Sequence, residues 1–175
     1  MIAPADARYR KAPGTPPGAA GAEVAERVAA ILADIEAGGL DAVRRWSREL
    51  DGWDPPSFVA GPDEIERATA SLDPALREHI AFAQRQVRGF AQAQLDTLRD
   101  LRVEPLPGVA LGHRHIPVGT VGAYVPGGRY PMLASSFMTI LVAKTAGVPT
   151  VIGCGPPQRD GGVGPAMLHA MATSG

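Results

Sequence analysis

The segment best suited to bind a small molecule is Val118–Gly128, which reads VGTVGAYVPGG. A β-like run leads into a proline and then into two adjacent glycines, Gly127 and Gly128. Glycine allows left-handed backbone conformations and lets a ligand approach the main chain closely. A cofactor could therefore lie at the end of this predicted strand, although a purely structural turn explains the same local pattern.

The histidines and the cysteine offer no second site. His113 and His115 alternate on a predicted strand and so share a face. Two imidazoles are fewer than the three protein ligands of a catalytic zinc, so a polar strand face is the preferred interpretation. His79 and His169 lack acidic neighbours suited to a triad, and Cys154 lacks a nearby histidine to activate it. We therefore predict no catalytic and no metal-binding residue within this chain.

Composition excludes several classes of partner. Seventeen Lys and Arg against eighteen Asp and Glu give a net charge of -1, which provides no field for nucleic acid or acidic membranes. No apolar run reaches the roughly 18 to 20 residues of a membrane-spanning helix, and the first residues do not resemble a secretory signal. A single cysteine fits a reducing compartment. We expect a cytoplasmic protein that binds neither nucleic acid nor membranes.

The first hundred residues are predicted to be mostly helical. Residues 1–21 are rich in proline and glycine and poor in large apolar side chains, so we expect a flexible arm. Residues 22–104 carry apolar side chains at helical spacing, with a break at Gly38-Gly39. Asp73-Pro74 supplies an N-cap and a proline at the first helical position. A long helix is predicted to follow it and to extend to about Arg102.

Residues 105–175 change to an α/β pattern. Two β-like runs, 109–115 and 118–125, predict a pair of strands. Residues 131–147 are apolar nearly all round, which suits a buried helix, and residues 148–153 suit a parallel strand covered on both faces. Another helix is predicted from Val163. The predicted fold class is α/β, with a helical N-terminal region, then a strand pair, then the start of an incomplete Rossmann-like domain.

Several motifs in this second half occur together in a fixed order. They are Val118–Gly128, Pro131, Ser135, Lys144–Pro149, Val151-Ile152 and Gly155–Pro157. In this combination the chain resembles the histidinol dehydrogenase family. The resemblance is strong over residues 105–175 and weaker over the preceding helices. Because residues 167–175 read as a helix that reaches its C-cap, we expect the chain to stop in mid-fold.

The resemblance implies an NAD-dependent, zinc-requiring alcohol dehydrogenase that acts as a homodimer. The parent enzyme oxidises L-histidinol to L-histidine in two hydride transfers, with zinc orienting the alcohol and a base removing its proton. The tyrosine of the Tyr-Val-Pro-Gly-Gly segment contacts NAD in the family, which makes Tyr124 the expected cofactor contact. Gly127 and Gly128 are expected to shape the same loop. The family's zinc ligands and its acid–base Glu-His pair would lie beyond Gly175.

One departure from the family pattern bears on the substrate. The segment after the paired glycines, Arg129–Ser135, is similar to that of the sulfopropanediol dehydrogenase branch. Arg129 could then contact a sulfonate, since arginine complements oxyanions. A solvated loop arginine is the alternative interpretation.

Two functional hypotheses follow. In the first, the chain is the N-terminal portion of a dehydrogenase that oxidises histidinol or a related, sulfonated alcohol. In the second, it is a noncatalytic module that pairs with a longer subunit. In either case the 175-residue chain alone is expected to be inactive.

Overall fold

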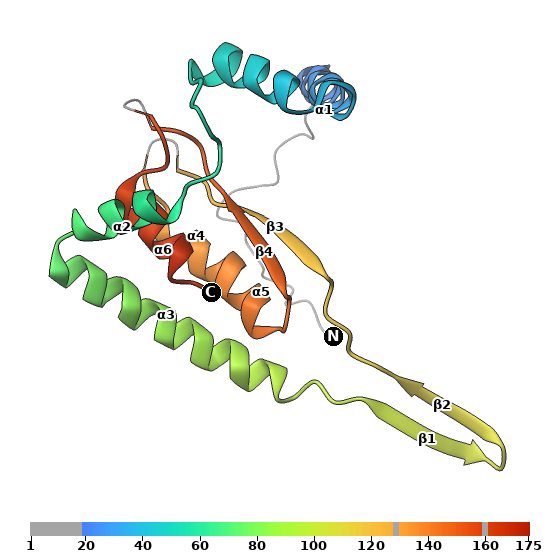
Figure 1. Cartoon of the computed structure of the whole chain (residues 1–175). Coiled ribbons are helices and arrows are strands. Elements are labelled where there is room, and N and C mark those ends of the chain that lie inside the picture. Colours follow the sequence, from blue (N-terminus) through green and yellow to red (C-terminus); the bar gives the residue numbers. More distant parts are fainter. Residues whose placement is uncertain (1–18, 128–129, 159–160) are drawn as a thin grey trace, which may run out of the picture. The chain divides into compact units, whose positions relative to one another are not determined.

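The computed structural model describes residues 19–127, 130–158 and 161–175 (Figure 1). The chain divides into two compact units, one ending at Asp54 and one running from Pro55 to Gly175. Residues 1–18 of the predicted arm lie outside the described residues, and the first helix begins at Ala19. None of the described helices combines the length and the apolar character needed to cross a membrane.

The first unit is built on α1 (Ala19–Asp51), which is broken at Gly39. Gly39 has φ 54° and ψ -136°, a left-handed conformation that favours glycine. The break predicted at Gly38-Gly39 is confirmed. It divides α1 into two helical arms, and Asp34 on the first arm accepts hydrogen bonds from Arg45 and from Trp46 Nε1 on the second.

A second carboxylate holds the end of α1. Asp54 accepts hydrogen bonds from Arg44 Nη1 at 3.0 Å and from Arg48 Nη1 at 2.9 Å. Hydrogen bonds from Arg48 and Arg44 lower the pKa of Asp54, and those from Arg45 and Trp46 lower the pKa of Asp34. Both carboxylates are therefore ionised partners in the first unit.

The second unit begins with two helices, α2 (Pro62–Ala70) and α3 (Pro74–Leu95). The predicted cap of α3 is confirmed, since Asp73 Oδ1 accepts a hydrogen bond from Ala75 N at 2.7 Å. The predicted extension of this helix to Arg102 is wrong. The helix ends at Leu95, and Leu101 begins a strand whose backbone pairs with the strand that follows it.

The four strands form two separate two-stranded sheets. β1 (Leu101–Leu106) and β2 (Val109–His113) form an antiparallel hairpin, whereas β3 (Thr120–Tyr124) and β4 (Thr150–Cys154) are parallel. Both predicted strands of the pair are present, as β2 and β3, but they belong to different sheets. The hairpin extends away from the helices of the second unit (Figure 1).

The connection from β3 to β4 is one continuous helical segment. It consists of α4 (Leu133–Ser136), a π-helical turn η1 (Phe137–Leu141) and α5 (Val142–Thr145). The predicted burial all round is wrong, since Met138 is 67% exposed. The predicted two-sided cover of the next strand is also wrong, since Ile152 in β4 is 59% exposed. In each case the described elements cover only one face.

The core of this unit lies between the β3–β4 sheet and the helices. A last helix, α6 (Pro165–Ala172), packs beside η1 on one face of the sheet. The α4–η1–α5 segment lies between that sheet and α3 (Figure 1). One cluster of buried residues joins the sheet to α6, and a second joins α3 to η1 and α6: Ala123, Val125, Ile140, Met167 and Met171, then Ile80, Phe137 and Ala170. This strand–helix–strand unit is the predicted start of a Rossmann-like domain.

Candidate cofactor-binding edge

The ends of β3 and β4 meet at one edge of the parallel sheet. Tyr124 and Cys154 are register partners at this end, and Val125 N donates a hydrogen bond to Cys154 O at 2.7 Å. The loops that follow both strands therefore leave the sheet side by side. We call residues 124–127 and 154–157 the carboxyl edge. Open α/β sheets bind ligands at this end of their strands.

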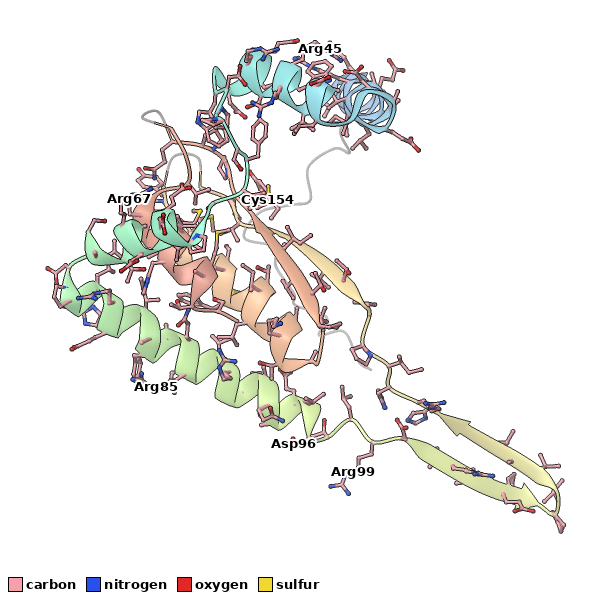
Figure 2. The ribbon with its side chains drawn as sticks, in the orientation of Figure 1. Arg45, Arg67, Arg85, Asp96, Arg99 and Cys154 are labelled. Carbon is pink, nitrogen blue, oxygen red and sulfur yellow. The ribbon has the colours of Figure 1, made fainter. Side chains whose placement is uncertain are left out.

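Tyr124 is the exposed aromatic side chain at the carboxyl edge. Its neighbours Ala123 and Val125 are buried, so strand alternation places Tyr124 on the opposite side, where it is 62% exposed. In the described part of the chain its hydroxyl makes no hydrogen bond. The ring and the hydroxyl are thus both available to a ligand, whereas Cys154 lies beside them as an exposed free thiol (Figure 2).

The glycines of the carboxyl edge are packed against protein atoms. A Cβ added to Gly127 would lie 2.8 Å from Met167 Cε and 3.4 Å from Pro156 Cγ. A Cβ added to Gly155 would lie 3.3 Å from Met167 Sδ. Gly127 does not adopt a positive φ. Its missing side chain therefore lets the strand-end loop rest on α6 and on the neighbouring loop, which fits a shaping role.

The residues that support the loop at Gly127 are not predicted by the sequence. Met167 follows Gly127 by forty positions, and no local pattern indicates that its side chain lies under the loop. Pro156 belongs to one of the family motifs, but no local pattern predicts its contact with Gly127. The two remaining predicted site residues, Gly128 and Arg129, lie outside the described residues.

The histidine pair lies away from this edge, at the base of the hairpin. The rings of His113 and His115 meet edge to face with centroids 5.1 Å apart. His113 Nε2 lies 3.1 Å from Arg99 O, and His115 Nδ1 lies 3.6 Å from Asp100 Oδ1. Within residues 19–127, 130–158 and 161–175, no three or more His, Cys, Asp or Glu side chains are grouped to hold a metal. These residues alone therefore do not fit a zinc site.

A hollow of about 280 Å³ lies next to the start of α6. It separates α2 from the loop that precedes α6. Its polar and charged lining residues are Glu64 and Arg67 of α2, Ser71 just after α2, and Gln158 of the loop. From α6 the apolar Pro165 and Leu168 line it. The packing of α2 on α6 therefore forms one wall of this hollow.

Comparison with known proteins gives a consistent result. Residues 17–175 match the family model described as histidinol dehydrogenase. A histidinol dehydrogenase homolog from Shouchella clausii is 48% identical over 87% of this chain and 36% of its own length. Sulfopropanediol 3-dehydrogenase from Ruegeria pomeroyi is 44% identical over 85% of this chain and 34% of its own length.

The fold is likewise similar to a solved structure. The crystal structure of histidinol dehydrogenase from Elizabethkingia anophelis superposes with a TM-score of 0.82 at 23% identity. The match covers 93% of this chain and 36% of that one. The chain thus spans about a third of the length of the curated relatives it matches.

Proposed function

Because this chain belongs to the histidinol dehydrogenase family, we propose that it forms the first part of an NAD-dependent, zinc-requiring alcohol dehydrogenase. The observation that carries the proposal is the exposed Tyr124 at the end of a parallel strand, beside the loop that follows its register partner. Dinucleotides are bound at such edges in α/β proteins. An oxidoreductase function agrees with the family.

In the proposed dehydrogenase, the carboxyl edge binds NAD. The Tyr124 ring would pack on NAD while its hydroxyl meets a polar group of the cofactor. Gly127 would let the loop pack closely on Met167 of α6 and so fix its course beside the cofactor. We propose that Gly128 shapes the same loop. When bound, NAD supplies the hydride acceptor for alcohol oxidation. Zinc and the acid–base pair would be held by residues other than those described.

The proposed function is tested on a full-length protein. The chain is joined to the remaining two-thirds of the Shouchella clausii relative. Zinc-dependent reduction of NAD is then followed with two alcohols, L-histidinol and sulfopropanediol. Turnover that disappears on chelation and returns with zinc supports the proposal. A stable, zinc-loaded and NAD-binding protein that turns over neither alcohol would contradict it.

A second function, a noncatalytic module that pairs with a longer subunit, is favoured by the β1–β2 hairpin. The apolar side chains of this hairpin are between 42% and 64% exposed, and they are Leu101, Val103, Leu106, Val109 and Leu111. An isolated two-stranded hairpin is marginally stable, so a further surface is expected to cover it. In this case the chain forms a stable complex with the longer subunit, and the chain itself contributes no turnover.

For the dehydrogenase we also propose that it forms a homodimer and that it is located in the cytoplasm.

The proposed substrate class is a small alcohol, either histidinol or a sulfonated diol. The similarity to a sulfopropanediol dehydrogenase supports the second, with Arg129 as the cation that meets the sulfonate. In the completed enzyme, kcat/KM is compared for L-histidinol and sulfopropanediol. Arg129→Gln is expected to lower kcat/KM for sulfopropanediol by roughly tenfold or more, because a charged hydrogen bond is lost. A preference for histidinol would refute this role.

A further inference from the structure

A buried histidine joins α2 to α6. His169 is 8% exposed, and its Nδ1 lies 3.0 Å from the Thr69 hydroxyl on α2. The two residues are one hundred positions apart, so this contact depends on the docking of α2 against α6 (Figure 1). Among the described residues no ion pair connects α2 with another element. The His169–Thr69 contact is therefore a polar link between these two helices.

The surroundings of His169 disfavour its charged form. Burial lowers the pKa of His169, and the positive charge of Arg77 on α3 lowers it further. Arg77 Nε is itself buried and has no hydrogen-bond partner among the described residues. A second cation beside it would be poorly solvated.

No carboxylate faces His169 from the helices packed around it. The α4 and η1 segments contain no titratable side chain, and α6 contains none besides His169. From α3 the facing charge is Arg77, and from α2 the facing group is the neutral Thr69. The titratable side chains of α2 are Asp63, Glu64, Glu66 and Arg67, all of them exposed. Among the described residues, protonation of His169 would therefore meet a cation and no compensating anion.

We propose that His169 is a pH-sensitive latch that holds α2 on α6. With Nδ1 unprotonated, the imidazole accepts a hydrogen bond from the Thr69 hydroxyl and α2 stays docked. Protonation places two cations at the same buried junction and releases α2. Because α2 and α6 contribute Glu64, Arg67 and Leu168 to the hollow beside them, release also opens that hollow. The latch does not depend on the proposed dehydrogenase activity.

Hydrogen exchange of the 175-residue chain tests the latch. Protection of residues 62–70, corrected for intrinsic exchange rates, is measured between about pH 8 and about pH 5. It is expected to fall as the pH drops below 6.5, by at most about tenfold per pH unit because one proton is bound. In His169→Gln, which keeps hydrogen-bonding groups but cannot be protonated, α2 protection should no longer depend on pH in this range. The control His79→Gln alters an exposed histidine of α3 and should keep the wild-type response.

A second measurement serves if His169→Gln does not fold. The imidazole of His169 is titrated by NMR in the wild type and in Arg77→Met. Removal of the guanidinium should raise the pKa of His169 toward its ordinary value. The pH-dependent loss of α2 protection should then become smaller, because the docked and released states bind the proton more equally. Protection of α2 that stays constant with pH in the wild type, or that changes equally in His169→Gln, would overturn the latch. So would an unchanged titration of His169 in Arg77→Met.

Discussion

Tyr124 and Cys154 occupy the last paired positions of the parallel β3–β4 sheet, and both side chains are exposed there. The opposite face of the same two strands is packed on Ile140, Met167 and Met171. One side of this small sheet thus serves the core, and the other side is free at the end where α/β sheets bind ligands. Substitutions on the two faces of the sheet should therefore have different effects on stability.

The core face leaves little room for an added methyl group. In Gly153→Ala the new Cβ would lie 2.8 Å from Met171 Cε and 2.9 Å from Ile140 Cδ1. We expect a loss of about 1 kcal/mol in the opening free energy of α6 amides, measured by hydrogen exchange, because the flexible ends of two buried side chains must shift.

Gly122→Ala is the matched control for this effect. Gly122 lies on the neighbouring strand, and a Cβ added there would meet no atom within 4 Å. This change is therefore expected to cost less than about 0.5 kcal/mol. Equal losses in the two variants would refute the assignment of the two faces.

A buried amide should stabilise the junction of α3 with the end of α6. Gln84 Nε2 lies 2.9 Å from Thr173 Oγ1, 3.1 Å from Ala170 O and 3.3 Å from Ser174 Oγ. Gln84→Met removes the donor and is expected to destabilise the second unit by about 1–3 kcal/mol. Gln92→Met, on the exposed side of α3, should change stability by less than about 0.5 kcal/mol. Similar hydrogen-exchange losses at both sites would show that the amide is unimportant.

The first unit should loosen in acid. The folded-state pKa of Asp34 is lowered below 3.8, so its contribution is present above that pH and is lost as the pH falls through the folded value. Both tryptophans of the chain, Trp46 and Trp53, lie in this unit, so their fluorescence reports its opening. Asp34→Asn should weaken the acid transition, and the exposed Asp41→Asn should leave it unchanged. An identical transition in all three proteins would exclude Asp34 as its cause.

Local chemistry in the sequence predicts the starts and breaks of several elements. The Asp73-Pro74 pair indicates the cap of α3, and Gly38-Gly39 indicates the interruption of α1. These features depend on neighbouring residues alone. The strand–helix–strand order of residues 120–154 is likewise visible in the sequence, as a β-like run, a largely apolar segment of helical length and a short β-branched run.

Features that depend on distant partners are not visible in the sequence. Leu95, Leu98 and Leu101 continue a helical spacing, yet Leu101 pairs with His113 in a hairpin. The contact of Thr69 with His169 and the support of Gly127 by Met167 also join segments far apart in the chain. The cofactor role of Tyr124 comes from resemblance to the family and stays a prediction.

The most direct test of the central claim is the affinity of the completed enzyme for NAD with and without the Tyr124 hydroxyl. Tyr124→Phe should raise the dissociation constant for NAD by about two- to tenfold, as expected for one lost hydrogen bond, and Tyr124→Ala should raise it further. Tyr130 is another exposed tyrosine, and Tyr130→Phe should leave the dissociation constant for NAD unchanged. If NAD binds Tyr124→Ala as tightly as the wild type, the carboxyl edge of β3 and β4 is not the cofactor site.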